Sequence, residues 1–258
     1  LTYSPLNANK LVLGTVQMGL DYGINNTGGK MTTDEAVEVM NAARTAGVEY
    51  LDSAAAYGNA EEVIGQYNES HKANPFKVIT KLMHDQEVSS SASASLEKLK
   101  FDKIDVLLFH SFEQYKNSTN NRDALEHLLA TRKVGRVGVS VYTNEEAASL
   151  LDDPLVSIVQ APFNLIDNHN LRADTFKALK AAGREVHTRS VFLQGLFFMG
   201  SAKAPAYLKP LFRHLNTLEA LVADYNLNIG QLALGYALAQ EYIDKVLIGV
   251  DSLAQIAS

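Results

Sequence analysis

Short continuous runs of apolar residues alternate along this chain with longer segments in which apolar residues recur every three or four positions. Continuous rather than alternating hydrophobicity is typical of strands that are buried on both faces of a parallel sheet. The runs predict eight strands: Leu11–Thr15, Val48–Asp52, Phe76–Lys81, Ile104–His110, Val134–Val141, Val156–Gln160, Arg184–Ser190 and Lys245–Val250.

The segments between these runs have the periodicity of amphipathic helices. They are Thr33–Ala46, Asn59–Asn68, Val88–Lys100, Asn121–Arg132, Asn144–Leu151, Asn170–Ala182 and Ile229–Gln240, with a further helical pattern over 207–225. Thr33 is the expected cap of the first helix and Gly47 its expected stop.

Strands that alternate with helices, with no linker and no break in composition, predict an α/β protein with a single (β/α)₈ TIM barrel domain over residues 1–258. The alternative is an open doubly wound sheet, which usually places a Gly-rich nucleotide turn after its first strand. No G-x-G-x-x-G occurs in the sequence. The eighth helix begins near Ser252 and is cut off at Ser258. About a dozen or more further residues are therefore expected beyond Ser258, judged from a normal helix length.

Composition excludes several classes of protein. The chain has 23 basic and 29 acidic residues, a net charge of −6, and no cysteine. This balance disfavours a nucleic-acid or anionic-membrane partner, and the lack of cysteine excludes disulfides and thiolate chemistry. No run approaches the roughly 18 apolar residues that cross a bilayer, and no signal peptide is visible at the N-terminus. A cytoplasmic protein is expected, with its oligomeric state left open.

Polar residues gather where the predicted strands end. In a barrel of this kind the carboxyl ends of the strands meet on one face, where active sites lie. These ends carry Asp52 with Tyr57 after it, Lys81, His110, Ser140, Gln160, and the group His187, Arg189 and Ser190. One such residue is usually structural, but six converging polar strand ends indicate a site.

The same residues carry a family resemblance. The segment from Asp52 to Gly58, followed by Glu62 and Gly65, resembles the aldo-keto reductase signature D-x-A-x-x-Y-G and E-x-x-G. The strands that end in Lys81 and His110 resemble the family's lysine and histidine strands. The resemblance runs in order from Leu11 to the end of the chain.

The resemblance implies a catalytic tetrad of Asp52, Tyr57, Lys81 and His110, with Tyr57 as the proton donor. Hydride arrival at a carbonyl carbon makes an alkoxide, which needs a proton, and a free phenol is a poor proton donor at neutral pH. A nearby ammonium favours the phenolate, which gives Lys81 its role, and Asp52 would hold Lys81 charged. His110 would donate a hydrogen bond to the carbonyl oxygen.

The resemblance also implies a nicotinamide cofactor, NADPH or NADH. Ser140 and Gln160 resemble the contacts to the cofactor's carboxamide, and the segments after the seventh and eighth strands resemble its phosphate side. The expected cofactor residues are Ser140, Gln160, Arg189, Ser190, Gln194, Gly195, Leu196, Gly249, Asp251, Ser252 and Gln255. No metal site is expected.

The sequence departs from the family at two cofactor positions. Arg189 stands where many members have a tyrosine that stacks on the nicotinamide, so it either stacks there itself or points elsewhere. Asp251 stands where members that prefer NADPH have a serine within a basic phosphate-binding segment. A carboxylate repels a phosphate but accepts hydrogen bonds from a ribose diol, so a weak preference for NADPH at most, or a preference for NADH, is expected.

The expected activity is reduction of an aldehyde or ketone. The polar segment from Gly19 to Asn26 resembles bacterial relatives linked to sugar or polysaccharide metabolism, which suggests a sugar-derived carbonyl. The alternative within the same fold is a cofactor-binding regulatory subunit of a membrane channel. A metal-dependent barrel hydrolase would need clustered ligands such as H-x-H after the first strand, and none is present.

Overall fold

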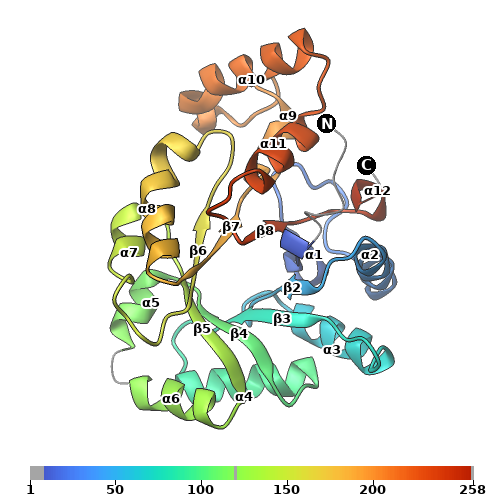
Figure 1. Cartoon of the computed structure of the whole chain (residues 1–258). Coiled ribbons are helices and arrows are strands. Elements are labelled where there is room, and N and C mark those ends of the chain that lie inside the picture. The colour runs from blue at the N-terminus through green and yellow to red at the C-terminus, as the bar shows by residue number, and fades with distance from the viewer. Residues whose placement is uncertain (1–8, 119–120, 257–258) are drawn as a thin grey trace.

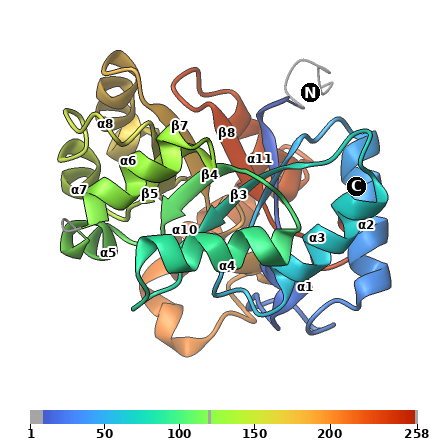
Figure 2. The same cartoon turned by 90° about the horizontal axis from the view of Figure 1, so that it is seen from below.

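Parallel strands close into a barrel with helices around it (Figures 1 and 2). The computed structural model describes residues 9–118 and 121–256. The strands pair in chain order, and β1 also pairs with β8, which closes the barrel. They are β1 (Leu11–Gly14), β2 (Tyr50–Asp52), β3 (Lys77–Lys81), β4 (Ile104–Phe109), β5 (Val134–Ser140), β6 (Ile158–Pro162), β7 (Glu185–Arg189) and β8 (Lys245–Ile248). The predicted single (β/α)₈ barrel is confirmed.

The helices follow the predicted order, with bounds that differ by a few residues and with some additions. The main ones are α2 (Thr33–Thr45), α3 (Ala60–Ser70), α4 (Val88–Leu99), α6 (Arg122–Ala130), α7 (Asn144–Ala148), α8 (His169–Ala181), α10 (Phe212–Asp224) and α11 (Ile229–Leu238). Short helices that the pattern did not predict are α1 (Val16–Gly19), α5 (Phe112–Asn117) and α9 (Leu196–Met199). The eighth helix begins as α12 (Leu253–Ile256), and its expected continuation lies outside the described residues.

The expected cap of α2 is wrong by one residue. Thr32 caps the helix, because its side chain accepts from the Glu35 backbone N–H while the Glu35 carboxylate accepts from the Thr32 backbone N–H. This reciprocal arrangement needs a Glu three residues after the cap, and only Thr32 has one there. Gly47 does end the helix region, with a φ of +88° that favours glycine.

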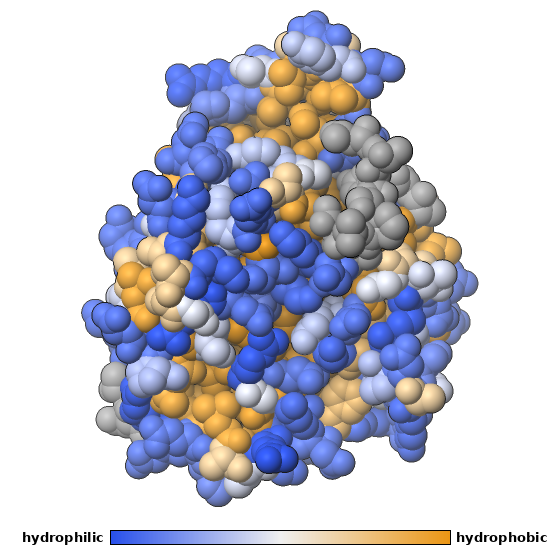
Figure 3. Space-filling model, viewed as in Figure 1, coloured by the Kyte–Doolittle hydropathy of each residue, from blue (hydrophilic) through white to orange (hydrophobic). Residues whose placement is uncertain are grey.

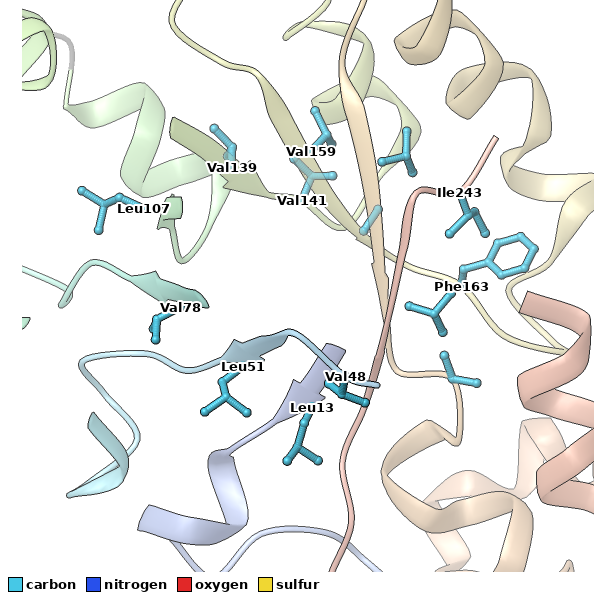
Figure 4. Packing of buried hydrophobic residues seen from close by; sticks show 14 of the residues in the cluster. Leu13, Val48, Leu51, Val78, Leu107, Val139, Val141, Val159, Phe163 and Ile243 are labelled. Carbon is cyan, nitrogen blue, oxygen red and sulfur yellow. The ribbon is translucent and has the colours of Figure 1, made fainter. Parts of the chain in front are cut away.

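The main core lies between the barrel and its helices. Strand side chains that point outward pack there, and Figure 4 shows Leu13, Leu51, Val78, Leu107, Val139 and Val159 among them. The intervening residues point into the barrel, where a smaller apolar cluster fills the centre: Val12, Ile79, Val106, Leu108, Ile158 and Leu247. A packed centre separates the two ends of the barrel, so the polar strand ends form a site of their own.

The opposite end of the barrel carries charged residues, and some of them form ion pairs. Lys77 bonds Glu49 at 3.0 Å and Arg136 bonds Glu185 at 2.5 Å around a cavity of about 650 Å³. Tyr50 lies below the centre of the barrel and beside this cavity. This end lies away from the polar strand ends.

The molecular surface in Figure 3 is largely hydrophilic, with apolar residues gathered beside α10. A groove of about 290 Å³ lies there, between α9, α10 and α11. None of the described helices has the length and apolar character needed to cross a membrane.

Candidate active site

A buried ion pair forms the floor of the site. Lys81, the last residue of β3, bonds the Oδ1 atom of Asp52, the last residue of β2, and its Nζ also donates to the Ser53 carbonyl at 2.9 Å. The two side chains are only 2% and 3% exposed. Burial by itself would lower the pKa of Lys81, but the Asp52 carboxylate together with Tyr57 outweighs it and raises that pKa above its ordinary value. Lys81 is therefore a fixed cation.

A tight turn presents Tyr57 above this pair. The Tyr57 backbone N–H donates to the Ala54 carbonyl at 2.9 Å, and Gly58 follows with a φ of +55°. A Cβ on Gly58 would lie 2.3 Å from the Gly19 carbonyl oxygen of α1, so only glycine fits this turn. As a result, Lys81 Nζ lies 5.3 Å from the centroid of the Tyr57 ring, and Tyr57 itself is half-buried.

His110 completes the predicted group of four residues. It follows β4 directly, and its backbone N–H donates to Gln114 Oε1 at 2.9 Å. Its ring lies edge-on to Tyr57, with 5.9 Å between ring centroids. Burial, followed by the Lys81 charge, lowers the pKa of His110 to about 4. The imidazole is therefore neutral at pH 7 and can donate only one N–H.

The pKa of His110 predicts a pH effect on stability. Because its pKa is about 4 in the folded protein and near 6.5 when unfolded, the unfolded chain binds more protons between these values. The His110 contribution should therefore destabilise the fold as pH falls from about 6.5 to 4. Urea unfolding of wild type and His110→Asn across this range measures it: the wild type should lose more stability. Equal losses in both proteins would show that His110 titrates normally.

Gln160 extends the buried network across the barrel. Its Nε2 donates to Asp52 Oδ2 at 2.9 Å, and it pairs in register with Ser140 at the end of β5. Both side chains are buried, and the Oε1 atom of Gln160 has no hydrogen-bond partner among the described residues. A buried acceptor without a donor is costly, and the amide N–H of a nicotinamide is a donor of the type it lacks. The residues here fit that group.

Arg189 points toward the loop after β5. Its guanidinium carbon lies 4.3 Å from the centroid of the Tyr142 ring, and its Nη2 donates to the Val141 carbonyl at 3.2 Å. One face of the guanidinium is thus covered by Tyr142. The expectation that Arg189 stacks on the nicotinamide stays a prediction, since the other face carries no ring in the described structure.

The segment after β7 has a strained backbone. Ser190, Leu193 and Gln194 have φ values of +64°, +49° and +56°, in the left-handed region that non-glycine residues rarely adopt. Gln194 accepts at its carbonyl from the Ile24 N–H at 3.1 Å, so the loop after β1 lies against this segment. Such strain clusters at ligand sites, which agrees with the predicted role of this segment.

The remaining predicted cofactor residues lie beside this segment. A Cβ on Gly195 would come within 2.8 Å of Asn25, and Leu196 is buried at the start of α9. After β8, the Asp251 backbone N–H donates to Gln255 Oε1 at 2.8 Å, and Ser252 is exposed. Gly249 lies between β8 and this turn, where a Cβ would come within 3.0 Å of Gln17. The structure thus brings the β1, β7 and β8 segments together.

One residue of the site was missed by the sequence reasoning. Gln17, in α1, donates through Nε2 to Asp251 Oδ1 at 3.2 Å, and its own Oε1 is buried with no hydrogen-bond partner among the described residues. Nothing local marks Gln17. Glu61 lies outside the site: it is 1% exposed and accepts from Thr80 Oγ1 at 2.6 Å. Side chains alternate along a strand, so Thr80 faces α3 while Lys81 points into the barrel.

Glu62, which was matched to the E-x-x-G part of the family signature, lies outside the site. It pairs with Lys98 at 3.3 Å on the surface between α3 and α4. His187, although on β7, bonds Glu185 at 3.1 Å toward the opposite end of the barrel, so it is not part of the site. Within the described ranges no group of three or more His, Cys, Asp or Glu residues could hold a metal ion.

Comparisons with known proteins agree with this geometry. The aldo/keto reductase family model matches residues 10–258. L-galactose dehydrogenase of Arabidopsis thaliana is 25% identical over 88% of this chain and 77% of its own length. A probable voltage-gated potassium channel subunit beta of Oryza sativa is 23% identical, over 92% and 84% respectively.

A solved structure shares the fold. The holo form of an aldo-keto reductase from Bacillus halodurans has a TM-score of 0.73 and 18% sequence identity, covering 96% of this chain and 84% of that one. The family-model match extends over nearly the whole chain and includes Asp52, Tyr57, Lys81 and His110. The chain therefore belongs to the aldo/keto reductase family of oxidoreductases.

Proposed function

We propose that this protein reduces an aldehyde or ketone with a hydride from NADPH or NADH, and that Tyr57 is the general acid. The observation that carries the proposal is the buried Asp52–Lys81 pair beneath Tyr57, with a neutral His110 at the edge of the same phenol. A lysine buried only to pair with an aspartate adds little stability, which favours a functional role for the pair.

Each residue has a distinct role in the proposed reaction. The nicotinamide, when bound, supplies the hydride. His110 donates its N–H to the carbonyl oxygen and orients it, and Tyr57 delivers a proton to that oxygen as negative charge develops. Lys81 stabilises the phenolate that Tyr57 leaves behind, and Asp52 keeps Lys81 in place.

We assign the nicotinamide to Ser140 and Gln160. The Oε1 atom of Gln160, which has no partner among the described residues, would accept a hydrogen bond from the carboxamide N–H. Arg189 and Ser190 lie beside them on and after β7. The phosphate side would lie along the segments after β7 and β8, where the segments that follow β1 and β7 approach closely. The residues assigned to it are Gln194, Gly195, Leu196, Gly249, Asp251, Ser252 and Gln255.

A panel of aldehydes and ketones with each reduced cofactor tests the activity. Absorbance at the reduced-nicotinamide band should fall only when a carbonyl compound and the protein are both present. Sugar-derived aldehydes belong in the panel, since the relative from Arabidopsis thaliana is named for L-galactose. Loss of absorbance that does not depend on the carbonyl would contradict the proposal.

Cofactor preference gives a separate prediction. Asp251 lies where the 2′-phosphate of NADPH is expected, with Oδ1 held by Gln17 at 3.2 Å. A carboxylate near a phosphate costs on the order of 1 kcal/mol at a partly exposed site, so NADPH should not bind a hundredfold more tightly than NADH. Asp251→Ser should shift the ratio of the two Kd values toward NADPH by roughly fivefold.

Fluorescence of the bound reduced nicotinamide measures both Kd values. Asp102→Ser is a matched control, because it removes one exposed acid before β4, at the other end of the barrel. An equal shift in both variants, or a hundredfold NADPH preference in the wild type, would show that Asp251 does not sense the phosphate.

A cofactor-binding regulatory subunit is the second candidate, favoured by the similarity to the Oryza sativa channel subunit. Such a subunit keeps the fold and binds the cofactor without substantial turnover. Tight cofactor binding with no reduction of any carbonyl in the panel would favour it over the enzyme.

A further inference from the structure

Arg189 is an arginine without an acidic partner at the mouth of the barrel. In contrast, Arg136 and Arg172 each lie within 2.6 Å of a carboxylate. Within residues 9–118 and 121–256, no Asp or Glu oxygen comes within 4.0 Å of the Arg189 guanidinium. A half-buried guanidinium whose charge has no partner is costly unless a ligand supplies one.

Arg189 is also held in place with most of its donors free. Its Nη2 donates to the Val141 carbonyl at 3.2 Å and its Nη1 makes a long contact of 3.4 Å with Ser190 Oγ. The Tyr142 ring covers one face. A guanidinium has five N–H donors, so three remain without a protein acceptor in the described structure. A fixed planar donor of this kind suits a carboxylate, which it can bind with two parallel bonds.

The other ionisable groups near the reacting centre do not neutralise the positive charge of Arg189. Lys81 and Asp52 cancel each other, and His110 is neutral because its pKa is about 4. Arg189 is among the charges that hold the pKa of His110 down, after burial and Lys81, so it lies within electrostatic reach of the reacting groups. Among Asp52, Lys81, His110 and Arg189, the Arg189 charge is therefore the one that is left uncompensated.

The side chains around the Arg189 guanidinium are tyrosines. Tyr22 and Tyr142 are 39% and 61% exposed, and Tyr57 lies between the floor and the mouth. Burial raises the pKa of Tyr22, Tyr57 raises it further, and Arg189 lowers it. Tyr22, Tyr57 and Arg189 therefore lie close enough to interact electrostatically. Hydroxyl groups and a cation suit a polar, anionic substrate better than an apolar carbonyl compound.

We propose that Arg189 binds a carboxylate on the substrate, so that the protein prefers aldehydes or ketones that carry an acid group. This inference rests on the proposed function, since it names the substrate class of the same site. Arg189 acts here as a specificity-determining residue, while Tyr57 and His110 handle the carbonyl.

Paired substrates that differ only in charge test the proposal. kcat/KM is measured for 4-formylbenzoate and for its methyl ester with wild type, Arg189→Met, Arg189→Lys and Arg132→Met. Arg132 is an exposed cation between α6 and β5, so its removal controls for net charge.

The wild type should prefer the acid. Arg189→Met should lower the acid-to-ester ratio of kcat/KM by about 10- to 100-fold, mainly through KM for the acid. Any loss through the predicted cofactor contact of Arg189 affects both substrates and cancels in this ratio. Arg189→Lys should keep part of the preference.

Equal losses on acid and ester in Arg189→Met, or a wild-type preference for the ester, would overturn the proposal. Calorimetric binding of 4-(hydroxymethyl)benzoate and its methyl ester with oxidised cofactor separates this inference from the proposed function. If neither aldehyde is reduced but Arg189→Met selectively loses the acid ligand, the carboxylate site stands and the reductase activity does not. If both aldehydes are reduced without an acid preference, the activity stands and the carboxylate site does not.

Discussion

Replacing Tyr57 with phenylalanine should reduce turnover by about 10²- to 10⁴-fold while leaving cofactor binding nearly intact. The hydroxyl is the only group removed, and general acid catalysis is worth factors of this order. Tyr57 is half-buried and makes no side-chain hydrogen bond in the described structure, so the fold should tolerate the change. Single-turnover rates with a saturating carbonyl compound measure the chemical step directly.

Tyr22→Phe is the matched control, because it removes a second phenol from the same mouth. It should change turnover by only a few fold. Wild-type turnover in Tyr57→Phe, or an equal loss in Tyr22→Phe, would mean that the proton comes from another group.

Replacing Lys81 with methionine should lower both activity and stability. The side chain is 2% exposed, and its loss leaves the Asp52 carboxylate buried without its cation. Breaking a buried pair in this way costs about 3–5 kcal/mol of unfolding free energy. Turnover should fall by at least about tenfold, because the phenolate that Tyr57 leaves behind loses its nearby cation. Urea unfolding and single-turnover rates measure the two effects.

The double variant Asp52→Asn/Lys81→Met separates stability from catalysis. Removing both charges relieves the uncompensated carboxylate, so most of the lost stability should return. Turnover should stay low, because Tyr57 still lacks the ammonium. Recovery of turnover together with stability would show that Lys81 acts only as a structural cation.

The cluster of four catalytic candidates could be predicted because its signals are local. Asp52, Lys81 and His110 each end an apolar run, and parallel strands in a barrel bring such ends to one face. Tyr57 follows Asp52 through a turn that only glycine at position 58 permits. Each of these features is read from a few neighbouring residues.

The short helices could not be predicted, because each has too few residues to show a pattern. The short helices α1, α5 and α9 have four to six residues, too few to show a helical period. They nevertheless matter to the site: α1 carries Gln17, and the first turn of α5 places Gln114 against the His110 backbone.

The sequence by itself determined the barrel, the order of its elements and the residues at its strand ends, because periodicity and strand ends are properties of neighbouring residues. The tertiary structure decided which side chains bond to one another. Gln160 reaches Asp52 across 108 residues, and Gln17 reaches Asp251 across 234. Arg189, at the end of β7, reaches across β6 to Val141 and Tyr142 after β5. Such contacts depend on barrel closure and side-chain direction, which no local pattern encodes, and they make an unpaired arginine part of the mouth of the site.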